Sequence, residues 1–325
     1  MLEESAMDLF TPVNAAKAAS LLTLAHGLPH FVSPSNKILP SEQPRRSTMV
    51  VLKQRAVLTQ SSSLSRPPLM SALLHFAPRP TTKKYRVKAS GPHQVITRRI
   101  GASLLWFFAM SWCLVFNTDY TLIEAYAVGA LPFIIDGIGS WFSDEPKRFH
   151  FSAYTNNCML LHFVLSVAAA RSRTDDNWQD YHLQFSIGWW LVHAVSFSLL
   201  PRFGATGLWE IKDVDDEGIF LFRMCGFCCA TNATVLALLY QGMDPVHAFG
   251  YGFAVQTVGL AYPFLMNVLR RHGTNDTVNE RKGLGMVEDR HCYVVVCSLI
   301  LTVMMLQGSD AVVEEPMKGL VADRT

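Results

Sequence analysis

Seven predominantly apolar stretches alternate with short polar segments along residues 98–307 of the chain. A helix that crosses a bilayer needs about 20 mostly apolar residues, with a working range of about 17–25. The stretches that approach this length are residues 100–116, 125–142, 151–170, 183–200, 219–240, 248–269 and 292–306, of which the last is the shortest. The pattern predicts an all-α fold, a polytopic helical membrane bundle with about seven transmembrane helices.

The composition agrees with a membrane protein. Of the 325 residues, 50% are hydrophobic and 17% are charged, whereas charged residues make up about 25% of a typical soluble domain. Mean hydropathy is +0.20 even though the first 97 residues are polar. The seven cysteines lie in or beside apolar stretches without the spacing of a secreted disulfide framework, so we interpret them as small buried hydrophobes.

The basic residues are segregated along the chain. With the N-terminus on the cytoplasm-like side, here called the inner side, the inner segments hold 24 of the 28 Lys and Arg residues and the outer segments hold four. Without the long N-terminal segment, the short inner loops still lead by ten to four. Because loops on the cytoplasmic side carry an excess of Lys and Arg, this bias predicts an inner N-terminus and an outer C-terminus. The segregation indicates membrane topology and no nucleic-acid partner.

Residues 1–97 are rich in Ser, Thr, Pro, Lys and Arg, and no acidic residue lies between Glu42 and Asp119. This composition is typical of a transit peptide, which favours the inner membrane of a mitochondrion or plastid. Three acidic residues among the first ten argue against that interpretation, and the alternative is a disordered tail in an endomembrane protein. Residues 308–325 form a short acidic C-terminal tail in this scheme.

The first and fifth apolar stretches are similar in sequence. Without a gap, their alignment pairs Arg98 with Arg223, Gly101 with Gly226 and Asp119 with Asp244. After a slip of two residues it continues into the second and sixth stretches, where it pairs Ala125 and Gly129 with Ala248 and Gly252. An even number of spans between the two units gives them the same orientation. We therefore predict a parallel repeat, with repeat one in residues 98–170, a linker helix in residues 183–200 and repeat two in residues 219–307.

The small residues of this alignment are expected to pack helices. Ala125 and Gly129, like Ala248 and Gly252, lie one helical turn apart on one face, which lets another helix approach closely. Close packing is the preferred interpretation of all four.

Ionisable residues within the spans are candidates for function, because a charge at the bilayer centre costs about 2.5–3.5 kcal/mol on insertion scales. The candidates are Asp136, His162 and His193, which lie at similar depths in their helices. A carboxylate facing an imidazole makes a proton relay or a solute-binding pair. The alternatives are an early helix end at Asp136 and histidines that donate to neighbouring carbonyls. Asn232 and Gln256 are expected either to bond between helices or to line a polar path through repeat two.

The sequence gives no signature of catalysis. Cys225, Cys228 and Cys229 have no partner pair with zinc-site spacing, and the histidines form no metal-binding pair, so we predict no catalytic or metal-binding residue and leave any cofactor unspecified. Three functions remain: a carrier or channel for a small solute or protons, a non-catalytic structural or assembly subunit of an organellar membrane complex, and an enzyme that modifies a lipid or quinone. The expected partners are the lipid bilayer and either copies of the chain or other membrane subunits.

Overall fold

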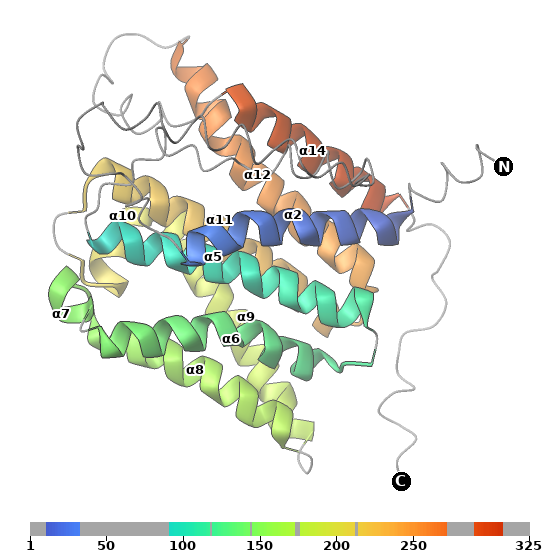
Figure 1. Ribbon diagram of the computed structural model, residues 1–325, viewed down its shortest axis with the longest axis horizontal. Helices are drawn as coiled ribbons and strands as arrows, with labels where there is room; N and C mark the ends of the chain where they lie inside the picture. Colours follow the sequence, from blue (N-terminus) through green and yellow to red (C-terminus); the bar gives the residue numbers. More distant parts are fainter. Residues whose placement is uncertain are drawn as a thin grey trace, which may run out of the picture. The chain divides into compact units, whose positions relative to one another are not determined.

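The computed structural model describes residues 11–32, 91–117, 119–143, 145–172, 176–211, 214–271 and 289–307, and within these ranges it contains helices and no strand (Figure 1). The long helices are α2 (Pro12–Val32), α5 (Gly91–Ser111), α6 (Leu122–Phe142), α8 (Ala153–Arg171), α9 (Asp176–Ser198), α11 (Asp216–Tyr240), α12 (Pro245–Arg271) and α14 (Asp289–Leu306). Short segments are α7 (Glu145–Phe149), α10 (Pro201–Phe203) and the π-helical turns η2 (Trp112–Phe116) and η3 (Gly204–Leu208). The predicted all-helical fold is confirmed for this part of the chain.

Three of the described helices are long and apolar enough to cross a membrane, namely Pro92–Phe116, Leu122–Phe142 and Gly218–Tyr240. A fourth candidate is Asn177–Ser198 together with Pro201–Leu208, two segments that bend by 112° at their junction. These candidates match the first, second, fifth and fourth predicted stretches. The remaining predicted stretches are also helical, as α8, α12 and α14. The described parts of those helices do not meet the same criterion, so a count of seven spans stays a prediction.

Helix α5 lies at the centre of the bundle and packs against α2, α6 and α11. Its Trp106 is fully buried, with its ring centroid 5.7 Å from that of Tyr126 on α6 and 5.7 Å from that of Trp190 on α9. The next residue, Phe107, packs against Phe249 of α12 at 5.1 Å. Because successive residues of a helix point in different directions, α5 contacts helices from both halves of the chain.

The predicted packing residues lie at helix crossings. Ala125 and Ala248 are completely buried. Gly129 brings α6 against Trp106, where a Cβ atom would lie 2.8 Å from the indole Cδ1. Gly252 brings α12 against Val235 of α11 in the same way. A larger residue at either glycine would push two helices apart.

Residues 12–32 form a packed helix, where we expected part of a disordered tail or a transit peptide. Helix α2 runs antiparallel to α5, since Ser20 bonds to Ser111 near one end and Gly27 contacts Gly101 near the other (Figure 1). Its buried face consists of Ala15, Ala16, Ala19, Ser20, Thr23 and Gly27. Small residues on that face permit close packing without a continuous apolar run, so hydropathy alone missed the helix. Most of the remaining predicted tail, residues 1–10 and 33–90, and the acidic segment 308–325 lie outside the described residues.

Candidate functional site

Two adjacent arginines of α5 enter the bundle and meet two carboxylates. Arg98 Nε donates to Asp136 Oδ1 at 2.6 Å, and Arg98 Nη1 donates to Glu145 Oε1 at 2.7 Å. Its Nη2 also contacts the second oxygen of Glu145 and lies 3.3 Å from Ser140 Oγ. Arg98 therefore holds Glu145 through both guanidinium ends, a geometry that fixes orientation as well as charge.

Arg99 approaches the same aspartate from its other side. The Nε atom of Arg99 lies 2.8 Å from Asp136 Oδ2, an ion pair whose atoms are not aligned for a hydrogen bond. Its Nη2 donates to Asn156 Oδ1 at 2.7 Å, while Nη1 faces the sulfur of Met159, which is a weak acceptor. The guanidinium carbon lies 5.6 Å from the centre of the Trp209 ring. Asp136 thus bridges two arginines, and both it and Arg99 have side chains only 2% exposed.

The network of Arg98, Arg99, Asp136 and Glu145 balances two positive charges with two negative ones. Burying one unpaired ion costs several kcal/mol, and mutual attraction offsets this cost only when every member has a partner. Burial by itself would raise the pKa of Glu145, but hydrogen bonds and charge from Arg98 outweigh burial and hold that pKa below its ordinary value. Glu145 lies on α7, just outside the apolar part of α6, and closes the network at that end.

A pairing of Asp136 with a histidine was one interpretation of the sequence, but in the structure Asp136 lies between Arg98 and Arg99. His162 accepts or donates a hydrogen bond with the Tyr126 hydroxyl at 3.0 Å, and its ring stacks on that of His182 at 5.3 Å. His182 in turn bonds to Ser166 Oγ at 2.9 Å. These residues form a buried polar cluster between α6, α8 and α9.

His193 donates from Nδ1 to the Trp189 carbonyl at 2.8 Å, which is the backbone contact that the alternative interpretation described. Its ring also lies 4.6 Å from the Trp189 ring, and His162 stacks on the same indole at 5.0 Å. The structure therefore brings His162 and His193 to one common neighbour, Trp189.

Asn232 and Gln256 are buried in α11 and α12, with exposed fractions of 1% and 9%. Asn232 Nδ2 and Gln256 Oε1 have no hydrogen-bond partner among the described residues. Unsatisfied polar atoms are costly in a bilayer-spanning bundle, since no bulk water is available to bond them. These two positions keep their interpretation as candidates for a polar path.

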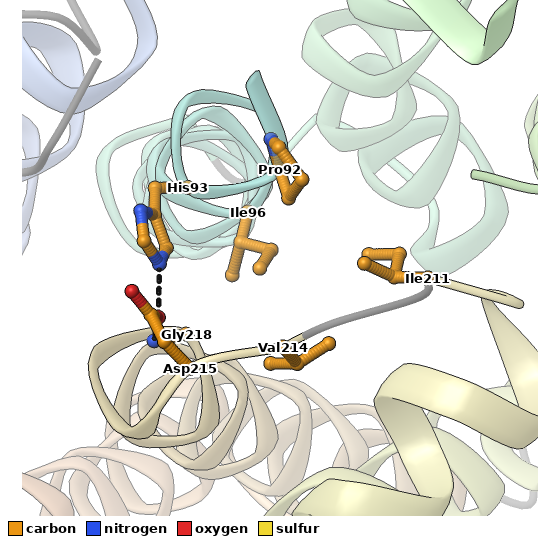
Figure 2. A pocket seen from close by; sticks show the side chains of 7 residues that line it. All are labelled: Pro92, His93, Ile96, Ile211, Val214, Asp215 and Gly218. Carbon is orange, nitrogen blue, oxygen red and sulfur yellow. Dashed lines mark hydrogen bonds and ion pairs between the residues drawn. The ribbon is translucent and has the colours of Figure 1, made fainter. Parts of the chain in front are cut away.

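A small cavity of about 100 Å³ opens near the charge network, between the first turns of α5 and α11 (Figure 2). Across it, His93 Nε2 lies 2.7 Å from Asp215 Oδ1. Asp215 also caps α11 by accepting from the Gly218 amide at 2.8 Å. Ile96, one helical turn before Arg99, and Ile211, two residues after Trp209, line the apolar part of the cavity.

Sequence reasoning missed the arginines, Glu145, Tyr126 and His182 as site residues. Arg98 and Arg99 were counted among the inner basic residues that flank the first span, and nothing in the sequence of α5 indicates that they reach Asp136 of α6. In the described residues, no three His, Cys, Asp or Glu side chains lie together in a way that could hold a metal ion.

Comparison with protein-family models, curated proteins and solved structures found no match to this chain. The site is therefore interpreted from its own geometry.

Proposed function

We propose that the protein is a multi-pass membrane carrier or channel for protons or a small solute, and that the Arg98–Arg99–Asp136–Glu145 network is part of its path. The observation that carries the proposal is the ion-pair network of Arg98, Arg99 and Asp136, which come from two helices apolar enough to cross a membrane, with Glu145 of α7 at its end. Ionisable residues in such helices are expensive, and they commonly mark ion and substrate pathways.

Asp136 is the member that holds both arginines to α6. Its two oxygens contact Arg98 and Arg99 of α5, whereas Glu145 pairs with Arg98. Among the described residues Asp136 is the carboxylate that pairs with Arg99, so its removal would leave Arg99 without an ion pair there while Arg98 kept Glu145. The charge link between Arg99 and α6 therefore depends on this one side chain.

The rest of the bundle supplies features that a carrier requires. The unsatisfied atoms of Asn232 and Gln256 can bond a passing solute or water. The parallel duplication predicted from the sequence adds support, because secondary carriers are commonly built from repeats with the site between them.

Reconstituted vesicles test the proposal directly. The purified protein is incorporated into liposomes that contain a pH-sensitive dye, a potassium diffusion potential is applied with valinomycin, and proton flux is followed. A parallel series follows vesicle swelling with small neutral and charged solutes. We expect flux of protons or of one solute class above that of empty liposomes, and at least a tenfold loss in Asp136→Asn.

The matched control is Asp119→Asn, which removes an exposed carboxylate from the loop before α6. Its flux is expected to equal that of the wild type. Size-exclusion profiles in detergent establish that both variants are folded. Vesicles that pass neither protons nor any tested solute, or a folded Asp136→Asn variant with normal flux, would contradict the assignment.

A further inference from the structure

Glycines that the sequence alignment pairs have corresponding contacts in the structure. Gly129 of α6 packs against Trp106 and Met110 of α5. Gly252 of α12 packs against Thr231 and Val235 of α11, which lie 125 positions after Trp106 and Met110. This is the same spacing that separates Arg98 from Arg223 in the sequence alignment. The α5–α6 and α11–α12 pairs therefore cross in the same register.

Glycines near the middle of α5 and α11 extend the equivalence to a helix outside the predicted repeat. At Gly101 a Cβ atom would lie 2.5 Å from the Phe31 amide nitrogen of α2. At Gly226 a Cβ atom would meet the Ser198 amide nitrogen of α9 in the same way. Each glycine thus accepts the backbone of a neighbouring helix, and α2 occupies beside α5 the place that α9 occupies beside α11.

A constant spacing relates α2 to α9. Phe31 and Ser198 lie 167 positions apart, and so do His26 and His193. Both histidines donate from Nδ1 to the carbonyl four residues earlier, at 2.8 Å in each case. The preceding residues also match, since Leu24-Ala-His26 corresponds to Leu191-Val-His193.

The far ends of the two helix pairs match as well. Lys17 of α2 lies 5.4 Å from the ring centre of Phe116, and Gln184, again 167 positions later, donates to the Tyr240 hydroxyl at 2.7 Å. Phe116 and Tyr240 are separated by 124 positions instead of 125. A π-helical turn holds one residue more than an α-helical turn, and η2 at Trp112–Phe116 accounts for the difference.

The remaining helices complete two units of four. Helix α8 packs against α6, and α14 packs against α12. Between the units, α14 lies against α2 and α8 lies against α9, while α5 and α11 pack together at the centre (Figure 1). We propose that the membrane domain consists of two parallel four-helix repeats, α2–α5–α6–α8 and α9–α11–α12–α14, so that α2 is its first membrane helix and α9 is no linker.

Helix α2 has the length of a membrane helix, although it is less apolar than the four candidates named above. Its 21 residues span about 31 Å, close to the thickness of the hydrocarbon core. Its exposed large side chains are Val13, Leu21, Leu28 and Val32, all apolar. Its polar Ser20 and Thr23 face the protein and bond there.

This arrangement changes the topology at the N-terminus. Because α2 is antiparallel to α5, residues 1–11 lie on the outer side with the C-terminus, and residues 33–90 lie on the inner side. Residues 1–11 contain three acidic residues and no Lys or Arg, whereas residues 33–90 contain eleven Lys and Arg and one acidic residue. The charge bias therefore agrees with eight helices. Three acidic residues near the N-terminus are unusual in a transit peptide, but they suit a segment on the outer side.

The pseudo-two-fold axis between the repeats passes between α5 and α11, beside the cavity of Figure 2. His93 and Gly218, which line that cavity from the two helices, are themselves 125 positions apart. If the proposed transport function is correct, this cavity lies where a path for protons or solute along the axis would open to the inner side.

Epitope tags in the full-length protein test the four-helix repeat without reference to transport. Tags are placed before Met1, after residue 60 and after Thr325, and protease access is measured in sealed vesicles of both orientations. We expect the first and last tags to be cleaved from one side and the middle tag from the other.

Two results would overturn the repeat. One is an N-terminal tag that shares the side of the tag at residue 60, which is the seven-helix topology. The other is a mature membrane protein that has lost the N-terminal tag, since residues 12–32 would then be absent from the bundle. Neither result bears on whether the vesicles conduct protons or a solute, so failure of the repeat and failure of the proposed function are distinguishable.

Discussion

Removing the carboxylate of Asp136 should destabilise the bundle, because Arg99 would keep its buried charge without an ion-pair partner. In Asp136→Leu, Arg98 keeps its two-ended contact with Glu145, but Arg99 keeps only Asn156, the Met159 sulfur and the face of Trp209. Loss of one partner from a buried ion pair costs about 3–5 kcal/mol, because the remaining charge is left uncompensated. With a side chain 2% exposed, Arg99 has little access to water, so we expect a loss within that range.

The double variant Asp136→Leu/Arg99→Met separates this explanation from a loss of packing. Removing both charges should recover at least about 2 kcal/mol of the loss, since replacing a whole buried pair with apolar side chains is often neutral. The assay is denaturant titration in detergent micelles, followed by tryptophan fluorescence. A double-variant cycle then gives the coupling energy between Asp136 and Arg99.

Two outcomes would refute the reasoning. If Asp136→Leu alone costs less than about 1 kcal/mol, the network is not stabilised by its charge balance. The second outcome concerns the double variant. If its loss of unfolding free energy equals the sum of the losses in Asp136→Leu and Arg99→Met, the cost comes from packing around Asp136 and not from an uncompensated Arg99.

Three further predictions follow from other parts of the molecule. Arg98 lowers the pKa of Glu145 in the folded protein. The stability that Glu145 contributes is therefore present above its ordinary pKa of 4.5 and is lost as the pH falls through the lower pKa of the folded protein. The denaturant midpoints of the wild type and Glu145→Gln should converge as the pH drops below 4.5. Gly101→Val and Gly226→Val should each lower the thermal midpoint in detergent by several degrees, because both glycines meet backbone atoms of a neighbouring helix. Val214→Cys, modified in reconstituted vesicles by a bulky maleimide from the inner side, should reduce flux by filling the cavity between α5 and α11.

Each of these has a control that the structure provides. Asp119→Asn removes an exposed carboxylate from the loop before α6 and should leave the acid dependence of stability as it is in the wild type. Gly139→Val and Gly188→Val are helical glycines with open space beside them and should change the midpoint little. Thr206→Cys, an exposed residue of η3 away from the cavity lining, should accept the maleimide without loss of flux. Equal effects in a test variant and its control would contradict the corresponding prediction.

Hydropathy located the helices better than it located their ends. The first predicted span starts at residue 100, whereas α5 starts at Gly91, because its first turns carry His93, Thr97, Arg98 and Arg99. A hydropathy average counts each polar side chain as if it faced lipid. In the folded chain His93, Arg98 and Arg99 pair with carboxylates from elsewhere in the sequence, and these partners cannot be read from the helix itself.

The partners of Asp136 could not be predicted for a similar reason. The sequence places Asp136 within an apolar stretch, but its partner depends on how α5 and α6 rotate against each other, which no single helix specifies. Helix α2 was missed because its buried face is made of small residues. Such a face packs through close backbone approach, which the contacts of Gly27 and Gly101 show and an average over apolar residues does not.

In the proposed repeat, the π-helical turn η2 allows one unit to be a residue longer than the other. An inserted residue in a regular helix rotates everything beyond it by about 100°, which would turn the end of α5 away from α2. The widened turn absorbs the extra residue locally, so Phe116 still meets Lys17 as Tyr240 meets Gln184. One half of a duplicated protein can thus change the length of a helix, and the loop that follows it, while both halves keep the same neighbours.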